Sequence, residues 1–187
     1  MSGHNKWSQI QRQKGATDEA KSRAFAKFSR LITIEAKKAA GDLSSPALAT
    51  AISRAKAINM PKDSIERAVA KGTSKDAAEL DQVNYEFYGP GGIAIIVSAL
   101  TDNKNRTTAE VKHLLTKNGF ELGVPGSAAW AFIKKPDGSF LPNEPMMPVS
   151  GDDEEKLNQM LTIFDEHDDV QAIFTNAQGY ESTSEEE

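Results

Sequence analysis

The first apolar pattern in the chain has helical spacing. Between Thr17 and Gly41, apolar residues recur every three or four positions, which is the period of one buried helix face. Thr17 or Asp18 can cap such a helix at its start, and Gly41 is a natural end. The residues predicted to face inward are Phe25, Phe28, Ile32, Ala36 and Ala39.

Two shorter helices are predicted after the first. Ser45 followed by Pro46 is typical of a helix start, and Pro61 is predicted to open a further helix that ends at Gly72. Both segments carry apolar residues at helical spacing. Three amphipathic helices can cover one another's apolar faces, so residues 1–75 are predicted to form a basic arm followed by a small helical bundle. The inward residues here are Leu48, Ala51, Ile52, Ala55, Ile65, Ala68 and Val69.

The pattern changes in the second half of the chain. From Val83 to Phe87 apolar and polar residues alternate, as in a strand with one buried face. A Gly-Pro-Gly-Gly turn then leads into the apolar run Ile93 to Val97, which predicts a strand buried on both faces. Further elements are predicted as a helix ending at Asn118-Gly119, a strand at 128–133, a weak strand at 146–149, a helix at 152–166 and a strand at 170–175.

This order of strands and helices predicts an α+β protein. Residues 82–178 fit a ferredoxin-like sandwich, in which helices cover one face of an antiparallel sheet. The acidic, Ser/Thr-rich residues 179–187 are predicted to be a disordered tail.

Composition excludes several classes of protein. The 187 residues include no cysteine, which removes disulfides, thiolate metal sites and cysteine nucleophiles. No run approaches the roughly 18 apolar residues that span a bilayer, and the polar start favours the cytoplasm. The common hydrolase, metalloprotease and phosphate-loop motifs are absent, so we expect no enzyme, cofactor, metal site or small-molecule substrate.

Charge divides the chain into two parts. Up to Lys75 there are 15 Lys and Arg against 6 Asp and Glu, a balance of +9, whereas the rest carries 7 against 21, a balance of −14. A polyanion is attracted to the first part and repelled by the second. Nucleic acid is therefore the predicted partner, with its main footprint on residues 1–75.

Two groups of residues are candidates for this contact. In the arm, cations would bind phosphates while Trp7 stacks on a base, the alternative being that Trp7 packs under the bundle and the cations are solvated. On the first helix, cations are interrupted only by Glu35 between Lys21 and Lys38. The predicted binding residues are Lys6, Trp7, Arg12, Lys14, Lys21, Arg23, Lys27, Arg30, Lys37 and Lys38.

A third candidate lies where the buried strand meets the next helix. Asn105 and Arg106 are near a predicted helix N-terminus and could hold a phosphate there. The alternative is a polar network that only ties the loop, because Asp and Asn residues are good cap and turn formers.

Four blocks carry a family resemblance. These are SGHNKW from Ser2, NMPKDSIERAVAKG from Asn59, YGPGGIAIIVSALTDNKNRT from Tyr88 and DDVQAIFTN from Asp168. In this order they resemble the YebC/PmpR family of probable transcriptional regulators, whose mitochondrial relatives are translational activators. The resemblance implies a cytoplasmic protein with a helical N-terminal domain and α/β domains behind it.

The chain also departs from that family in one respect. Family members usually have a further α/β domain between the segments that match 128–133 and 145–149, but here only residues 134–143 lie between them. The sequence therefore predicts a shortened form with two domains.

Two functions remain open at this stage. The chain is expected either to regulate transcription by binding DNA through its basic N-terminal domain, or to act as a ribosome-associated translation factor that binds ribosomal RNA. Both use phosphate contacts, so composition does not separate them. The sequence does not predict an oligomeric state.

Overall fold

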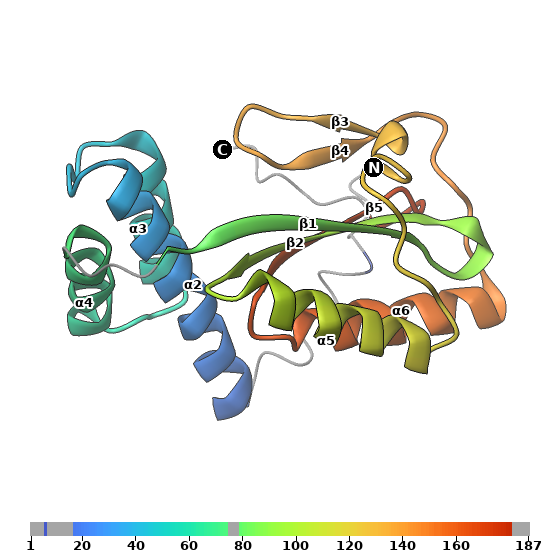
Figure 1. Cartoon of the computed structure of the whole chain (residues 1–187), viewed down its shortest axis with the longest axis horizontal. Helices are drawn as coiled ribbons and strands as arrows, with labels where there is room; N and C mark the ends of the chain where they lie inside the picture. Colours follow the sequence, from blue (N-terminus) through green and yellow to red (C-terminus); the bar gives the residue numbers. More distant parts are fainter. Residues whose placement is uncertain (1–5, 7–16, 75–78, 181–187) are drawn as a thin grey trace.

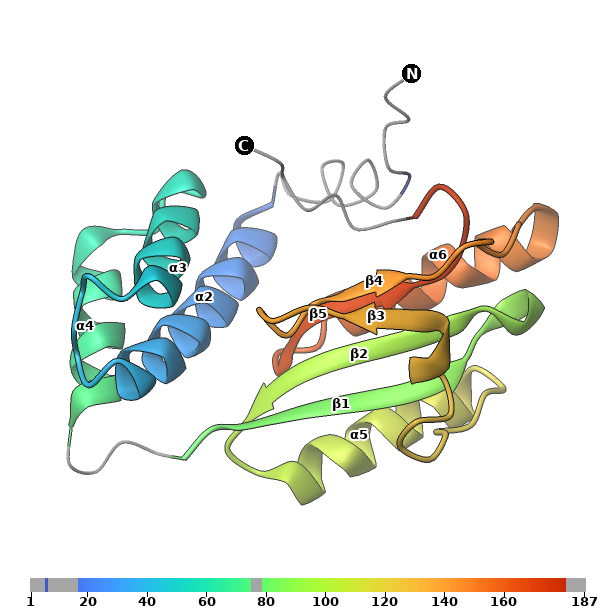
Figure 2. The same cartoon turned by 90° about the horizontal axis from the view of Figure 1, so that it is seen from above.

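The computed structural model describes residue 6 and residues 17–74 and 79–180. A helical domain and a sheet domain lie beside each other, with the longest helix of the first domain between its other helices and the sheet (Figures 1 and 2). Within the described residues, no helix is long and apolar enough to cross a membrane.

The longest helix is α2, Asp18–Lys38. Its start was predicted correctly, because the Thr17 side chain accepts a hydrogen bond from the Ala20 amide at 3.2 Å. After its end, Ala40 and Gly41 have positive φ, and the Gly41 amide donates to the Ala36 carbonyl. Gly41 therefore ends the helix as predicted, since glycine adopts this conformation without a steric penalty.

Helices α3, Pro46–Ala57, and α4, Lys62–Thr73, complete the bundle. Their apolar faces and that of α2 share one core. Gly72 differs from the prediction, because it lies within α4 and does not end it. A Cβ at Gly72 would lie 2.3 Å from the Thr33 carbonyl oxygen and 2.9 Å from Ala36 Cβ, so this glycine allows α4 to approach α2 closely.

The sheet domain contains a three-stranded antiparallel sheet in the order β1-β2-β5. Its strands are β1, Asp81–Tyr88, β2, Ala94–Thr101, and β5, Val170–Thr175. The short 3-10 turn η1, Pro90–Gly92, joins β1 to β2 as the turn motif predicted. All eight residues of β2 are buried, which confirms the prediction of a strand covered on both faces.

Each face of the sheet has its own cover. Helices α5, Lys104–Lys117, and α6, Gly151–Asp165, lie on one face (Figure 1). They pack against the side chains of β2 that point toward them, including Ile95 and Val97. The alternate residues Ala94 and Ile96 point to the opposite face and a second apolar cluster.

The second cluster is covered by a hairpin. The hairpin consists of strands β3, Phe132–Lys134, and β4, Phe140–Pro142, and the 3-10 turn η2, Ala129–Ala131, leads into it. The predicted strand at 128–133 thus begins only at Phe132. The cause is Glu86, whose carboxylate accepts hydrogen bonds from the amides of Gly126, Ala128 and Ala129 and so bends the chain before β3. Strand β4 was not predicted.

Two further predictions need correction. Residues 146–149 form an isolated bridge at Met147 and no strand, because Pro145 and Pro148 on either side have no amide hydrogen to donate. The predicted disordered tail begins too early, since Tyr180 is buried in the main core of the sheet domain. Residues 181–187 lie outside the described residues.

The α+β class is confirmed, with a helical domain followed by an antiparallel sheet whose helices lie on one face. The sheet has three strands, because the segment expected to supply another strand belongs to the hairpin on the other face. Residues 134–143, where the sequence predicted the loss of a domain, contain the end of β3, the turn and the second strand of that hairpin.

We predict that Gly72→Ala lowers the free energy of unfolding by about 2 kcal/mol, because the added methyl group collides with α2. At an uncrowded helical site the same change stabilises a protein. The sign of the change in unfolding free energy therefore shows whether Gly72 is crowded by α2. Chemical denaturation measures it. Ala70→Ser at an exposed position of the same helix is the control, with a cost of about 0.5 kcal/mol. Unchanged or increased stability of Gly72→Ala would contradict the close approach.

Candidate nucleic-acid interface

The cations of α2 divide between two environments. Lys21, Lys37 and Lys38 are exposed to solvent. Lys27 and Arg30, with side chains only 16% and 30% exposed, face the sheet domain. One helix therefore presents some of its predicted binding cations outward and uses others in contacts within the molecule.

Lys27 and Arg30 bind the chain between α6 and β5. Lys27 Nζ lies 2.5 Å from the Asp165 carbonyl oxygen and 3.2 Å from its carboxylate. Arg30 donates to the Asp168 carbonyl and forms an ion pair of 3.0 Å with Asp169 Oδ1. These contacts join the two domains through side chains about 138 positions apart in the chain.

Asp169 is the centre of this interface. It is 3% exposed, and its Oδ2 lies 2.7 Å from both Arg106 Nη2 and Thr107 Oγ1. Burial alone raises the pKa of a carboxyl group, but the hydrogen bonds from Thr107 and Arg106 and the charge of Arg30 outweigh it and hold the pKa of Asp169 below its ordinary value. Asp169 is therefore ionised and paired on both oxygens.

The neighbouring loop forms the polar network that the sequence offered as one alternative. Asn103 caps α5 by accepting a hydrogen bond from the Arg106 amide, and Arg106 also forms ion pairs with Asp102 and Glu110. Asn105, the other predicted residue, is exposed at the first turn of α5. The guanidinium of Arg106 is thus already engaged, and a phosphate contact at this loop stays a prediction.

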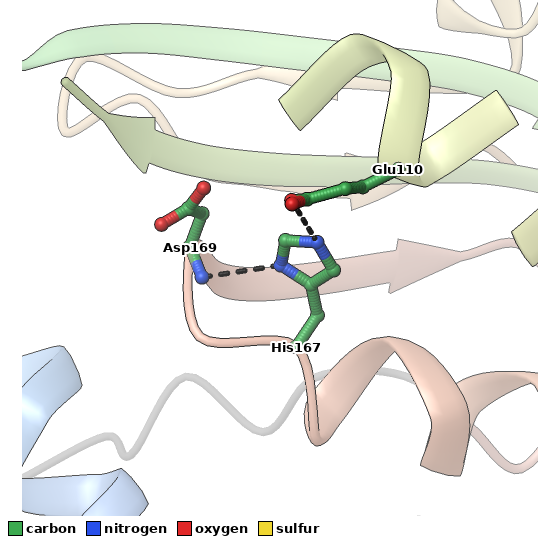
Figure 3. A group of neighbouring side chains, drawn as sticks. All are labelled: Glu110, His167 and Asp169. Atoms are coloured by element: carbon green, nitrogen blue, oxygen red, sulfur yellow. Dashed lines mark hydrogen bonds and ion pairs between the residues drawn. The ribbon is translucent and has the colours of Figure 1, made fainter. Parts of the chain in front are cut away.

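Figure 3 shows the side chains in this region whose atoms come close enough to hold a metal ion, Glu110, His167 and Asp169. His167 Nδ1 accepts from the Asp169 amide, so its Nε2 carries the proton and donates to Glu110. Both Asp169 oxygens are bound by arginines. Two guanidinium groups at the same carboxylate oppose a divalent cation, so these residues fit an ion-pair network better than a metal site.

Only one predicted residue of the arm can be placed. Lys6 Nζ lies 2.5 Å from Glu154 Oε1 and 5.8 Å from the centroid of the Tyr180 ring. Its amide donates to the Gly179 carbonyl at 3.0 Å. Trp7, Arg12 and Lys14 lie outside the described residues. The first cation of the arm is therefore bound to the acidic domain near α6.

The outward surface of the bundle carries more cations than the sequence analysis selected. Lys37 and Lys21 form no ion pair within the described part of the chain, while Arg23 and Lys38 pair with acids on their own helix. The additional exposed cations on α3 and α4 are Arg54, Lys56, Lys62, Arg67 and Lys71. Their signal in the sequence was the basic balance of residues 1–75, but only the fold shows that each of them is exposed.

Comparison with known proteins identifies the family. The model of the TACO1/YebC protein N-terminal domain matches residues 5–75, and the model of the TACO1/YebC second and third domain matches residues 80–137. The chain belongs to the TACO1/YebC family. This confirms the resemblance carried by the four sequence blocks.

Curated relatives in this family share the name probable transcriptional regulatory protein. The one from Petrotoga mobilis is 51% identical over 137 residues, which cover 72% of this chain and 55% of the relative. The one from Treponema denticola is 40% identical over 196 residues, which cover 98% of this chain and 79% of the relative. The chain thus spans little more than half the length of the Petrotoga relative.

A solved structure of another protein has a similar fold. A conserved hypothetical protein from Aquifex aeolicus aligns with a TM-score of 0.75 and 26% sequence identity, covering 86% of this chain and 91% of that protein. The helical domain and the sheet domain therefore recur together in another protein.

We predict that Asp169→Asn lowers the free energy of unfolding at pH 7 by about 3 kcal/mol, because two arginines lose their buried partner. The pKa of Asp169 is lower in the folded protein than in the unfolded chain. Its contribution is therefore complete above the unfolded value of about 4 and is lost as the pH falls through the folded value.

Denaturation at several pH values checks this prediction. The Asn variant should lose less stability than the parent on acidification below about pH 4, because the group that titrates is gone. Asp168→Asn is the matched control, since this neighbour is exposed and binds Arg30 only through its carbonyl. Equal effects of the two substitutions would contradict the central place of Asp169.

Proposed function

We propose that this TACO1/YebC chain is a cytoplasmic, non-enzymatic regulator of gene expression that binds DNA through its basic helical domain. The names of its relatives support a role in transcriptional regulation. The charge balance of +9 up to Lys75 supports nucleic acid as the partner.

One observation carries this proposal further than charge alone. Lys21 and Lys37 are exposed on α2 and form no ion pair among the described residues, although acids dominate the rest of the chain. Lysines left unpaired in an acidic protein are available to neutralise phosphates. They are therefore the first residues of α2 that we assign to DNA contact.

The contacts of Lys27 and Arg30 support a different part in binding. Their cationic groups hold the sheet domain against α2, so they would fix the orientation of the basic surface. In this proposal they act by positioning, while the exposed cations of the bundle and the cations of the arm other than Lys6 contact phosphates. No spacing of Arg, Asn or Gln typical of base reading was found in the helical segments, which favours recognition of the backbone over sequence-specific readout.

We predict that Lys21→Glu combined with Lys37→Glu weakens binding to duplex DNA at least tenfold, because two favourable phosphate contacts become repulsive. Fluorescence anisotropy with labelled duplex measures affinity at several salt concentrations. The slope of log affinity against log salt should become shallower by about 2.

The matched control is Lys112→Glu combined with Lys117→Glu on α5, which makes the same charge change in the sheet domain. It should leave DNA affinity within about twofold of the parent. Equal losses in both variants would contradict a footprint on the helical domain.

The same proteins should be sedimented with ribosomes at low and moderate salt. DNA binding that depends on Lys21 and Lys37, without salt-sensitive ribosome association, supports the proposal. Ribosome association that depends on these lysines, with no DNA retention, would replace it by the translation-factor function.

A further inference from the structure

Trp130 is a large aromatic side chain that is held in place yet exposed. It is 67% exposed, and its Nε1 donates to the Tyr88 hydroxyl at 2.7 Å. That hydroxyl in turn donates to the Ser127 carbonyl, and Asn143 Nδ2 donates to the Trp130 carbonyl at 2.9 Å. Because ring and backbone are both fixed, a ligand would bind the indole with little loss of side-chain entropy.

An apolar strip continues from Trp130 along the hairpin. Ile133 and Leu141 lie opposite each other in the register of β3 and β4 and are 57% and 38% exposed. Phe132 and Phe140, on the other face of the hairpin, pack on the sheet. The hairpin thus has one face in the core and one apolar face in solvent.

Two lysines lie at the turn end of the hairpin. Lys134 is the last residue of β3 and Lys135 follows it, and neither forms an ion pair within the described ranges. Because side chains alternate along a strand, Lys135 lies on the side of Ile133, whereas Lys134 is in register with Phe140 on the other side. The other cations of the sheet domain lie on α5 and α6, which cover the opposite face (Figure 1). A polyanion approaching the acidic domain from the hairpin side would therefore meet these two lysines.

Nearby acids are engaged in local hydrogen bonds. Glu86 accepts from the amides that precede β3, and Asp137 accepts from the amide and hydroxyl of Ser139 in the hairpin turn. Hydrogen bonding to Ser139 lowers the pKa of Asp137, so it stays charged but is directed into the turn. The charge of Lys135 also lowers the pKa of Asp137, so the negative charge of the turn is partly balanced by a neighbouring lysine.

We propose that the exposed face of the β3–β4 hairpin is a second binding site, specific for single-stranded nucleic acid. A base stacks on the indole of Trp130, and Lys135 contacts a flanking phosphate, while Lys134 adds positive charge at the same end of the hairpin. Stacking on a fixed aromatic needs an unpaired base, which a duplex does not offer. The inference rests on the proposed function only in taking nucleic acid as the partner. It adds a contact on the acidic sheet domain.

The chain offers a site-specific reporter for this proposal. It contains two tryptophans, so Trp7→Phe leaves Trp130 as the only one. In that variant, titration with an oligouridylate of about ten nucleotides should quench the emission to saturation. Binding measured by this quenching should weaken with salt, with a log–log slope of about −0.7 for the phosphate contact of Lys135.

Paired substitutions test which lysines the quenching of Trp130 depends on. Lys134→Glu with Lys135→Glu, made in the Trp7→Phe chain, should reduce the affinity seen by quenching at least tenfold. Lys112→Glu with Lys117→Glu, on the opposite face, should leave it unchanged. Trp130→Ala should lower oligonucleotide affinity by about fivefold or more, and the lysine pair tests the site even if that variant fails to fold.

Three results would overturn the inference. Anisotropy that reports oligonucleotide binding without quenching of Trp130 would leave the proposed function standing and remove the hairpin site. Absence of both signals would remove the hairpin site, while the proposed function is decided separately by the anisotropy measured with duplex DNA. An emission shift that depends on protein concentration and not on oligonucleotide would show that the apolar face binds a second copy of the chain instead.

Discussion

The arrangement of the two domains depends on one buried carboxylate. Asp169 lies where the chain enters β5, and a charge buried at that depth is tolerated only when it is paired and hydrogen-bonded. Its partners are Arg30 from α2 and Arg106 and Thr107 from α5. The same group therefore completes the sheet domain and attaches the helical domain to it.

This constraint changes the meaning of the charge division along the chain. Part of the basic surplus of the helical domain neutralises acids of the sheet domain, as Lys27 does with Asp165. The remaining surplus faces solvent through residues such as Lys21 and Lys37. One helix thus has an inward set of cations that orients the molecule and an outward set that we assign to nucleic acid.

The sheet separates two chemical environments in a similar way. Residues of β2 alternate between a core under α5 and α6 and a smaller core under the hairpin. Glu86 directs the chain into that hairpin by accepting three backbone hydrogen bonds, and this bend places Trp130 at the surface. The exposed indole is therefore a product of the fold and of a carboxylate more than forty positions earlier.

The sequence by itself determined the features that depend on neighbouring residues. The cap at Thr17, the buried run of β2 and strand β5 were all predictable, because capping, periodicity and apolar runs act over a few positions. The tertiary structure alone decided the place of Gly72 inside α4, the late start of β3, and the pairing of Arg30 with Asp169. Each of these depends on a group distant in sequence, a relationship that local patterns along one chain do not contain.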